Sequence, residues 1–266
     1  MNQNEEETCV VTSVHEYLQV LAEIRPRWGV DDCVFQIWYR GQSRESYSLV
    51  PGAYRGDWDE ESMFNIFYTD LPCPPHERPT SEWDCYAMAQ HYRLPTRLLD
   101  WSMDPLCGLF FAVRGDHRDN EQPKWDSSDP PVVWLLEPTS LNIVCQREDS
   151  VYVAAEPVSA LDHYLPGRGS PELPSAFRPK RTTSRIQAQA GAFTVHGTRK
   201  CGIESIWKER HSELSNKRQV HLSKIIVADP ESVSRELFAL KHNRLKYFPE
   251  ADSLSDHLRR VFAPAQ

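Results

Sequence analysis

The sequence predicts an α+β fold, a single compact domain with a mixed or antiparallel β core flanked by helices. The chain has 266 residues, which is enough to bury a core of its own. Segments with a helical apolar period alternate with short runs of β-branched and aromatic residues that are typical of strands. The sequence has 20 prolines against 11 glycines, no internal repeat and no low-complexity tract, which favours an irregular α+β body over a repeat protein or a coiled coil.

Four helices and one strand are expected in the first half. Ser13 and Glu16 form a capping box for a first helix that ends at Pro26. Residues 1–33 are therefore an N-terminal helical segment, expected to form one continuous unit with residues 34–266. A strand at 34–39 should present Arg40 at its C-terminal end. The other predicted helices cover residues 60–67, 82–91 and 105–113, the last two capped by Ser81 and Asp104.

The second half begins with a polar segment, 114–131, that is predicted to be an exposed, mobile insertion before a strand at 132–136. Residues 156–183 contain five prolines, and we interpret this segment as a long lid or binding loop. Strands are expected at 186–196 and 220–228, followed by a helix opened by Asp229 and Pro230 and a last helix near 252–262.

Composition excludes several classes of protein. Lys plus Arg is 30 and Asp plus Glu is 38, so the net charge of −8 argues against a broad basic surface that binds nucleic acid by charge alone. No apolar stretch approaches the length of a membrane span, and the first residues are acidic where a signal peptide is basic, so we expect a cytoplasmic protein with no membrane partner. The seven cysteines form no C-x-x-C pair, which fits a reducing compartment and predicts no metal site.

A first polar segment surrounds Arg40 and Gly41. A guanidinium offers five donors and no acceptor, so its natural partner is a phosphate or a carboxylate, and the glycine would allow a ligand to approach the backbone. The alternative is that Arg40 pairs with an internal carboxylate and only stabilises the sheet.

A second polar segment runs from residue 90 to residue 102. Leu98 and Leu99 should anchor it in the core, which predicts a partly buried ion pair between Arg97 and Asp100 that stabilises the fold. Four neighbouring side chains can donate or accept hydrogen bonds in a pocket: Gln90, His91, Tyr92 and Thr96. We expect Arg40, His91, Thr96 and Asp100 to line or support one concave site.

These two segments strongly resemble the FRG domain family. The resemblance rests on Tyr-Arg-Gly-Gln at 39–42 and on Gln-His-Tyr-x-Leu-Pro-Thr-Arg-Leu-Leu-Asp-Trp-Ser at 90–102, and it continues in Leu-Phe-Phe-Ala-Val at 109–113 and in Arg-Ile-x-x-Gln-x-Gly-x-Phe-Thr at 185–194. It covers about residues 34–262. Tyr39 replaces the usual Phe of the family, and Arg93 stands where a Gly is usual.

The family is more distantly similar to ADP-ribosyltransferases, which implies an NAD-consuming intracellular toxin or anti-phage defence effector, held in check by an inhibitor protein. Arg40 would bind NAD, Tyr47 or Tyr92 would stack on nicotinamide, and Gln42 and Thr96 would hold ribose hydroxyls. The implied catalytic residues are Arg40, His91, Tyr92, Thr96, Asp100 and Gln189. The implied NAD-binding residues are Arg40, Gly41, Gln42, Tyr47, Arg97 and Phe193.

One departure concerns the late strand, where ADP-ribosyltransferases of the arginine class carry Gln-x-Glu or Glu-x-Glu. Here it would read Gln187-Ala188-Gln189, and a glutamine stabilises a developing cation less well than a carboxylate does. The missing carboxylate would come from another position: Asp100, Glu148, Glu156 or Glu204.

The acceptor of ADP-ribose is not defined by the sequence. Arg178, Lys180, Arg181 and Arg185 form a basic run that can hold an RNA or DNA backbone or a pyrophosphate, although such a run is also common in solvated loops. The alternative function is a non-catalytic module that binds a nucleotide or a phosphate. Nucleotide-binding and hydrolase signatures such as G-x-x-x-x-G-K-[ST], G-x-G-x-x-G and G-x-S-x-G do not occur.

Overall fold

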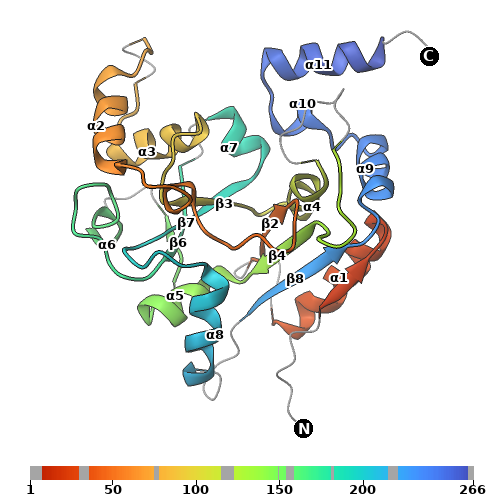
Figure 1. Ribbon diagram of the computed structural model, residues 1–266, viewed down its shortest axis with the longest axis horizontal. Coiled ribbons are helices and arrows are strands. Elements are labelled where there is room, and N and C mark those ends of the chain that lie inside the picture. The colour runs from red at the N-terminus through yellow and green to blue at the C-terminus, as the bar shows by residue number, and fades with distance from the viewer. Residues whose placement is uncertain are drawn as a thin grey trace.

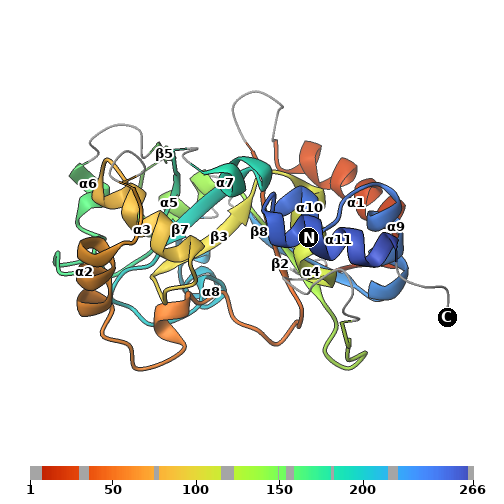
Figure 2. The same ribbon diagram turned by 90° about the horizontal axis from the view of Figure 1, so that it is seen from above.

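A single mixed sheet organises the protein (Figures 1 and 2). The computed structural model describes residues 8–29, 36–74, 78–114, 123–148, 150–153, 159–180, 183–214 and 221–262. In these residues the sheet has eight strands in the order β1-β8-β4-β2-β3-β7-β6-β5. The strands are β1 (Cys9–Val11), β2 (Trp38–Gln42), β3 (Leu98–Ser102), β4 (Val132–Leu136), β5 (Tyr152–Val153), β6 (Ser175–Arg178), β7 (Gly191–Val195) and β8 (Leu222–Val227). The pairs β1 with β8 and β5 with β6 are parallel, and the other neighbours are antiparallel.

Helices cover both faces of this sheet. They are α1 (Val14–Arg27), α2 (Glu60–Asp70), α3 (Glu82–His91), α4 (Pro105–Val113), α5 (Pro138–Gln146), α6 (Ser159–Asp162), α7 (Ser184–Ala188), α8 (Ile203–Leu214), α9 (Pro230–Ala239), α10 (Arg244–Tyr247) and α11 (Ala251–Val261). Side chains of Ser13, Ser81, Asp104 and Asp229 accept hydrogen bonds from backbone N–H groups in the first turns of α1, α3, α4 and α9. These caps are the reason that the four helices begin where the sequence predicts.

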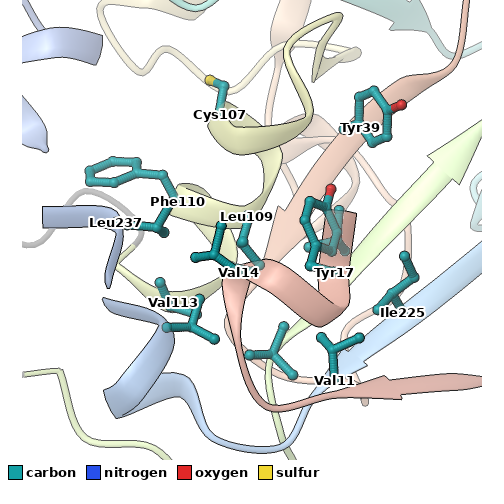
Figure 3. Close-up of a cluster of buried hydrophobic side chains, with 14 of the residues drawn as sticks. Val11, Val14, Tyr17, Tyr39, Cys107, Leu109, Phe110, Val113, Ile225 and Leu237 are labelled. Carbon is teal, nitrogen blue, oxygen red and sulfur yellow. The ribbon is translucent and has the colours of Figure 1, made fainter. Parts of the chain in front are cut away.

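In the described residues, three hydrophobic cores hold the layers together. The first core lies between α1, α4, α9 and the β1, β8, β4 and β2 part of the sheet, and Figure 3 shows Tyr17, Leu109 and Ile225 converging there. The second core joins α5 and α8 to the opposite face. The third core packs α2, α3 and α6 against β3, β6 and β7. Because α1 shares the first core with the rest of the domain, the N-terminal helical segment is an integral part of the fold.

Two glycines set the distance between β2 and α4. A Cβ on Gly41 would overlap with backbone atoms of Ala112 and Gly108, and a Cβ on Gly108 would lie 2.6 Å from the Cβ of Tyr39. The strand and the helix therefore touch through their backbones. Gly41 is required for this packing, because backbone atoms of α4 fill the position that its side chain would take.

Two sequence predictions for β2 and for residues 186–196 are wrong in their details. Arg40 lies in the middle of β2, because the strand continues through Gly41 to Gln42. Residues 184–188 form α7, since the Thr183 hydroxyl accepts a hydrogen bond from the N–H of Ile186. Ala190 then turns the chain with a left-handed φ of 45°, and the strand begins only at Gly191.

The segment 156–183 is not a lid in the described residues 159–180. It contains α6 and β6, and β6 pairs with β7 inside the sheet. Leu161, Tyr164 and Leu165 are buried in the third core. These apolar residues hold the proline-rich segment against the domain. Residues 156–158 and 181–182 lie outside the described part, as do residues 115–122 of the predicted insertion.

Candidate functional site

A cavity of about 560 Å³ lies at the line where β2 and β3 separate. β2 pairs with β4 over its full length and β3 pairs with β7 over its full length, whereas β2 and β3 are in register only at Tyr39 and Ser102. Beyond that pair the two strands diverge. Residues 40–43 line one side of the opening, and residues 98–102 line the other. Backbone polar groups at such a split need partners, which a ligand or water can provide.

Arg40 spans this split. Its Nη1 donates a hydrogen bond to the backbone oxygen of Asp100 at 2.6 Å. Its Nε is buried and has no hydrogen-bond partner in the part of the chain that the structure describes. Burial, and secondarily the positive charge of Arg55, lowers the pKa of Arg40 to about 10, although the Asp100 carboxylate partly opposes this effect. A cation in this position is stabilised by an anionic ligand.

The described residues that line the cavity are strongly basic for a protein with a net charge of −8. They include four arginines, namely Arg40, Arg55, Arg93 and Arg185, and a single carboxylate, Asp100. The cavity volume falls in the usual range for small-molecule sites, about 300–1,000 Å³. The balance of charge and size fits a small ligand that carries phosphate groups.

Asp100 is held by a chain of hydrogen bonds that begins at Thr96. The Thr96 hydroxyl donates to Gln90 Oε1 at 2.5 Å, and Gln90 Nε2 donates to Asp100 Oδ2 at 2.7 Å. Thr96 is buried, whereas the Asp100 side chain is exposed at the cavity. These two hydrogen bonds fix the orientation of the Asp100 carboxylate relative to the cavity.

A second group of contacts joins the cavity to the C-terminal segment. Arg185 donates to the backbone oxygen of His91 at 3.4 Å, and its guanidinium lies 4.4 Å from the centre of the Phe248 ring. His91 Nε2 lies 3.9 Å from a carboxylate oxygen of Glu250. Burial, then the charge of Arg185, lowers the pKa of His91, so its imidazole is neutral at pH 7. Gln189 donates to the backbone oxygen of Tyr247 at 3.0 Å.

The structure brings most of the predicted site residues to this cavity. Those that line it are Arg40, Gly41, Gln42, Tyr47, His91, Asp100, Gln189 and Phe193. Thr96 supports it through Gln90. Tyr92 is not among the lining residues, and its side chain is exposed next to Phe67. The two segments that lie about 50 residues apart in the sequence therefore meet at one concave site.

The predicted ion pair between Arg97 and Asp100 is wrong. Arg97 directly precedes β3, and its guanidinium contacts Glu60 of α2 instead of Asp100. Its Nε lies 2.7 Å from Glu60 Oε2, and its Nη2 donates to the backbone oxygen of Tyr164 at 2.5 Å. Arg97 does not line the cavity, so the expectation that it binds NAD has no geometric support.

The late-strand Gln-x-Gln prediction also needs correction. Gln187 lies on α7 and Gln189 caps its C-terminus, so neither residue is on a strand. Of the alternative carboxylates, Asp100 lines the cavity. Glu204 accepts a hydrogen bond from the N–H of Leu49, and neither Glu204 nor Glu148 is a lining residue. Glu156 lies outside the described residues.

Sequence reasoning did not single out Arg55 or Arg93 as site residues. Arg55 follows a short 3-10 helix, Gly52–Tyr54, and donates to the backbone oxygen of Val50 at 2.9 Å. Arg93 has a left-handed φ of 65°, which is the conformation that glycine favours and explains why a Gly at this turn is common. The available signal in the sequence was the arginine at position 93, where the FRG family usually has a glycine. Of the basic run, Arg185 lines the cavity, whereas Arg178 and Lys180 do not, and Arg181 lies outside the described residues.

Comparison with known proteins gives one match. The model of the FRG domain family matches residues 36–121, which include β2, β3, α4 and both polar segments. Neither the search of curated proteins nor the search of solved structures found a match. The similarity to ADP-ribosyltransferases is therefore not confirmed. In the part of the chain that the structure describes, every helix is too short or too polar to span a bilayer.

Proposed function

We propose that this chain binds NAD in the cavity between β2 and β3 and transfers its ADP-ribose to an acceptor. The observation that carries the proposal is that the buried Nε of Arg40 has no hydrogen-bond partner among the described residues, in a cavity that is basic. A pyrophosphate would supply two negative charges and several acceptor oxygens to Arg40 and Arg55. Tyr47, which is half exposed in the lining, is the ring that would stack on the nicotinamide.

In the proposed reaction, the glycosidic bond between the nicotinamide nitrogen and ribose C1′ breaks, and nicotinamide leaves with the bonding electron pair. A nucleophile on the acceptor forms the new bond to C1′ and loses its proton. Asp100 is the carboxylate that would stabilise the positive charge on the ribose, since Gln90 and Thr96 already orient it. His91, neutral at pH 7, would accept the proton.

The experiment is a steady-state assay of nicotinamide release from NAD, combined with calorimetric measurement of NAD binding. Arg40→Ala should weaken NAD binding at least about tenfold, because the pyrophosphate loses a charge-assisted partner. Asp100→Asn should lower kcat about 10²- to 10³-fold and leave NAD binding nearly unchanged. Arg235→Ala is the matched control, since this exposed arginine of α9 pairs with Glu231 on the surface and does not line the cavity.

Label transfer from NAD to RNA, DNA and protein identifies the acceptor in the same reaction. A nucleic-acid acceptor would fit the proposal of an intracellular toxin or defence effector that an inhibitor protein controls. Protein that neither binds nor consumes NAD would overturn the proposal.

A second candidate is a non-catalytic module that binds a nucleotide. Two observations favour it. No glutamate is among the described residues that line the cavity, and the side chain of Gln189, at the C-terminus of α7, donates to the backbone oxygen of Tyr247. NAD binding that depends on Arg40 without any release of nicotinamide would support this module. A rise in the melting temperature with another nucleotide, and not with NAD, would identify its ligand.

A further inference from the structure

The C-terminal part of the chain contacts one end of the cavity. Arg185, which lines the cavity, lies against the ring of Phe248 in the segment between α10 and α11. Figure 1 shows α10 beside α7 at this end of the molecule. Glu250 belongs to the same segment, and its carboxylate lies 3.9 Å from Nε2 of His91. His91 lines the cavity and Glu250 does not, so Glu250 acts on a bound ligand through His91.

Glu250 occupies the N-cap position of α11, but its side chain makes no cap hydrogen bond to the described first turn of that helix. N-cap side chains ordinarily accept such a bond, and serine, threonine, aspartate and asparagine do so best. The backbone of Glu250 is fixed, since its N–H donates to the oxygen of Phe248 at 2.8 Å and its oxygen accepts from Leu254 at 3.2 Å. The residue is thus held in place while its carboxylate faces His91 instead of the helix.

His91 lies between charges of both signs. Arg185 of α7 contacts its backbone oxygen, Glu250 faces its ring from the start of α11, and the charge of Asp100 on β3 also acts on it. Burial, then the charge of Arg185, lowers the pKa of His91 and keeps the imidazole neutral. A proton accepted by this ring creates a cation beside Arg185, which is unfavourable unless a carboxylate faces it. Glu250 is in the position to offset this repulsion.

We propose that Glu250 is a positioning residue for His91 in the transfer of ADP-ribose. A carboxylate only accepts hydrogen bonds, so Glu250 favours the tautomer with the proton on Nε2, and Nδ1 takes the proton of the attacking nucleophile. The electron pair left on the nucleophile forms the bond to ribose C1′, and nicotinamide leaves with the pair of the broken bond. Glu250 then stabilises the imidazolium. This inference rests on the proposed function, and it adds to the site a residue outside the matched range 36–121.

Titration of His91 by ¹⁵N NMR tests the contact in the protein alone. Glu250→Gln should lower the pKa of His91, because the imidazolium loses its counter-ion, and Arg185→Gln should raise it, because a repelling charge is removed. Glu231→Gln is the matched control, since this exposed carboxylate in the first turn of α9 pairs with Arg235 on the surface. It should leave the titration of His91 unchanged. An identical pKa of His91 in the wild type and in Glu250→Gln would overturn the proposal.

Hydrolysis of NAD, with water as the acceptor, tests the role in the reaction. Glu250→Gln should lower kcat for nicotinamide release about tenfold and leave KM within about twofold, because Glu250 acts on the proton acceptor and does not touch NAD. The acid limb of the pH profile of kcat/KM should move to lower pH together with the pKa of His91. A wild-type kcat in this variant, or an acid limb that stays in place, would contradict the positioning role.

Glu250→Ser separates positioning from a structural role. Serine is a better N-cap than glutamate, so the variant should fold with an unchanged or higher melting temperature. It also removes the carboxylate, so kcat and the pKa of His91 should fall as they do in Glu250→Gln. A lower melting temperature combined with a wild-type pKa of His91 would make Glu250 a structural residue and refute the proposal.

The proposed function can fail separately from this inference. Wild-type protein that binds NAD and releases no nicotinamide would refute the transferase. The NMR titration would then still decide whether Glu250 acts on His91: opposite shifts in Glu250→Gln and Arg185→Gln would retain Glu250 as the residue that sets the charge of His91 in a binding site, and equal titrations would exclude it.

Discussion

At the scale of single residues, the most informative case is Arg97. The sequence places it three residues before Asp100, and proximity in sequence suggested a pair. In the structure its guanidinium contacts Glu60 of α2, while its backbone N–H also donates to Glu60 and to the hydroxyl of Tyr86. A partner 37 residues away cannot be read from local spacing, because it depends on how α2 packs on the third core. Arg97 is thus part of the scaffold beside the cavity.

Removal of the Arg97 side chain should be strongly destabilising. Arg97→Ala leaves the mostly buried Glu60 carboxylate without its counter-ion, and we expect the free energy of unfolding to fall by about 3–5 kcal/mol. Urea denaturation measures it. A double-mutant cycle should show coupling of Arg97 with Glu60, and coupling below about 0.5 kcal/mol with Asp100. Strong coupling with Asp100 would instead support the ion pair between Arg97 and Asp100 that the sequence predicts.

His196 predicts how stability depends on pH. Both ring nitrogens are buried, and neither has a hydrogen-bond partner in the described ranges of the chain. Burial, then the charges of Arg40 and Arg97, lowers the pKa of His196 to about 3. The unfolded chain takes up a proton near pH 6.5 and the folded chain does not, so stability is full above that pH and is lost as the pH falls toward 3. The contribution of His196 to this loss is about 2 kcal/mol between pH 7 and pH 5.

Chemical denaturation at several pH values isolates this contribution. His196→Leu should flatten the pH dependence of the unfolding free energy over pH 5–7 by about that amount. His163→Leu, which replaces an exposed histidine, should retain the wild-type slope. Equal slopes for the wild type and for His196→Leu would mean that His196 is protonated in the folded protein.

At the scale of elements, capping residues predict where helices begin more reliably than prolines predict the structure of the segments around them. The helices α1, α3, α4 and α9 begin at the predicted caps, and β4 has its predicted bounds. α5 was missed although Glu137 and Pro138 open it, because a capping glutamate is a weaker signal than a serine or an aspartate. β6 was missed because prolines at 171, 174 and 179 surround a strand of four residues, whose pairing with β7 is set by distant contacts.

A prediction at the scale of elements concerns the backbone contact between β2 and α4. Gly41→Ala would place a methyl group 2.6 Å from the carbonyl carbon of Phe111 and in overlap with nearer backbone atoms. Strand and helix would have to move apart, at a cost of about 1–3 kcal/mol or more in unfolding free energy. Gly169→Ala is the control, because no atom lies within 4 Å of its Cβ position. Thermal unfolding of both variants compares them, and equal melting temperatures would show that the contact can relax.

At the scale of the whole molecule, the sequence predicted the class of fold and the meeting of two polar segments, and both predictions rest on local patterns. It could not predict the strand order, because β4 and β8 come between β1 and β2 only through pairings of residues far apart in the chain. It also could not predict the split between β2 and β3. That split is a property of the assembled sheet, and it decides that Arg40 faces a cavity and that Arg97 does not.

The parallel pairing of β1 with β8 has a consequence for synthesis of the chain on the ribosome. Cys9, Val10 and Val11 pair with residues 225–227, so the first strand has no sheet partner until most of the chain has emerged. During that time the apolar side of α1, including Tyr17 and Leu21, has no completed core to cover it. The nascent protein therefore carries an exposed hydrophobic N-terminal segment for most of its translation. Chaperones that bind emerging apolar segments would meet this part of the chain first, and release from them would coincide with closure of the sheet by β8.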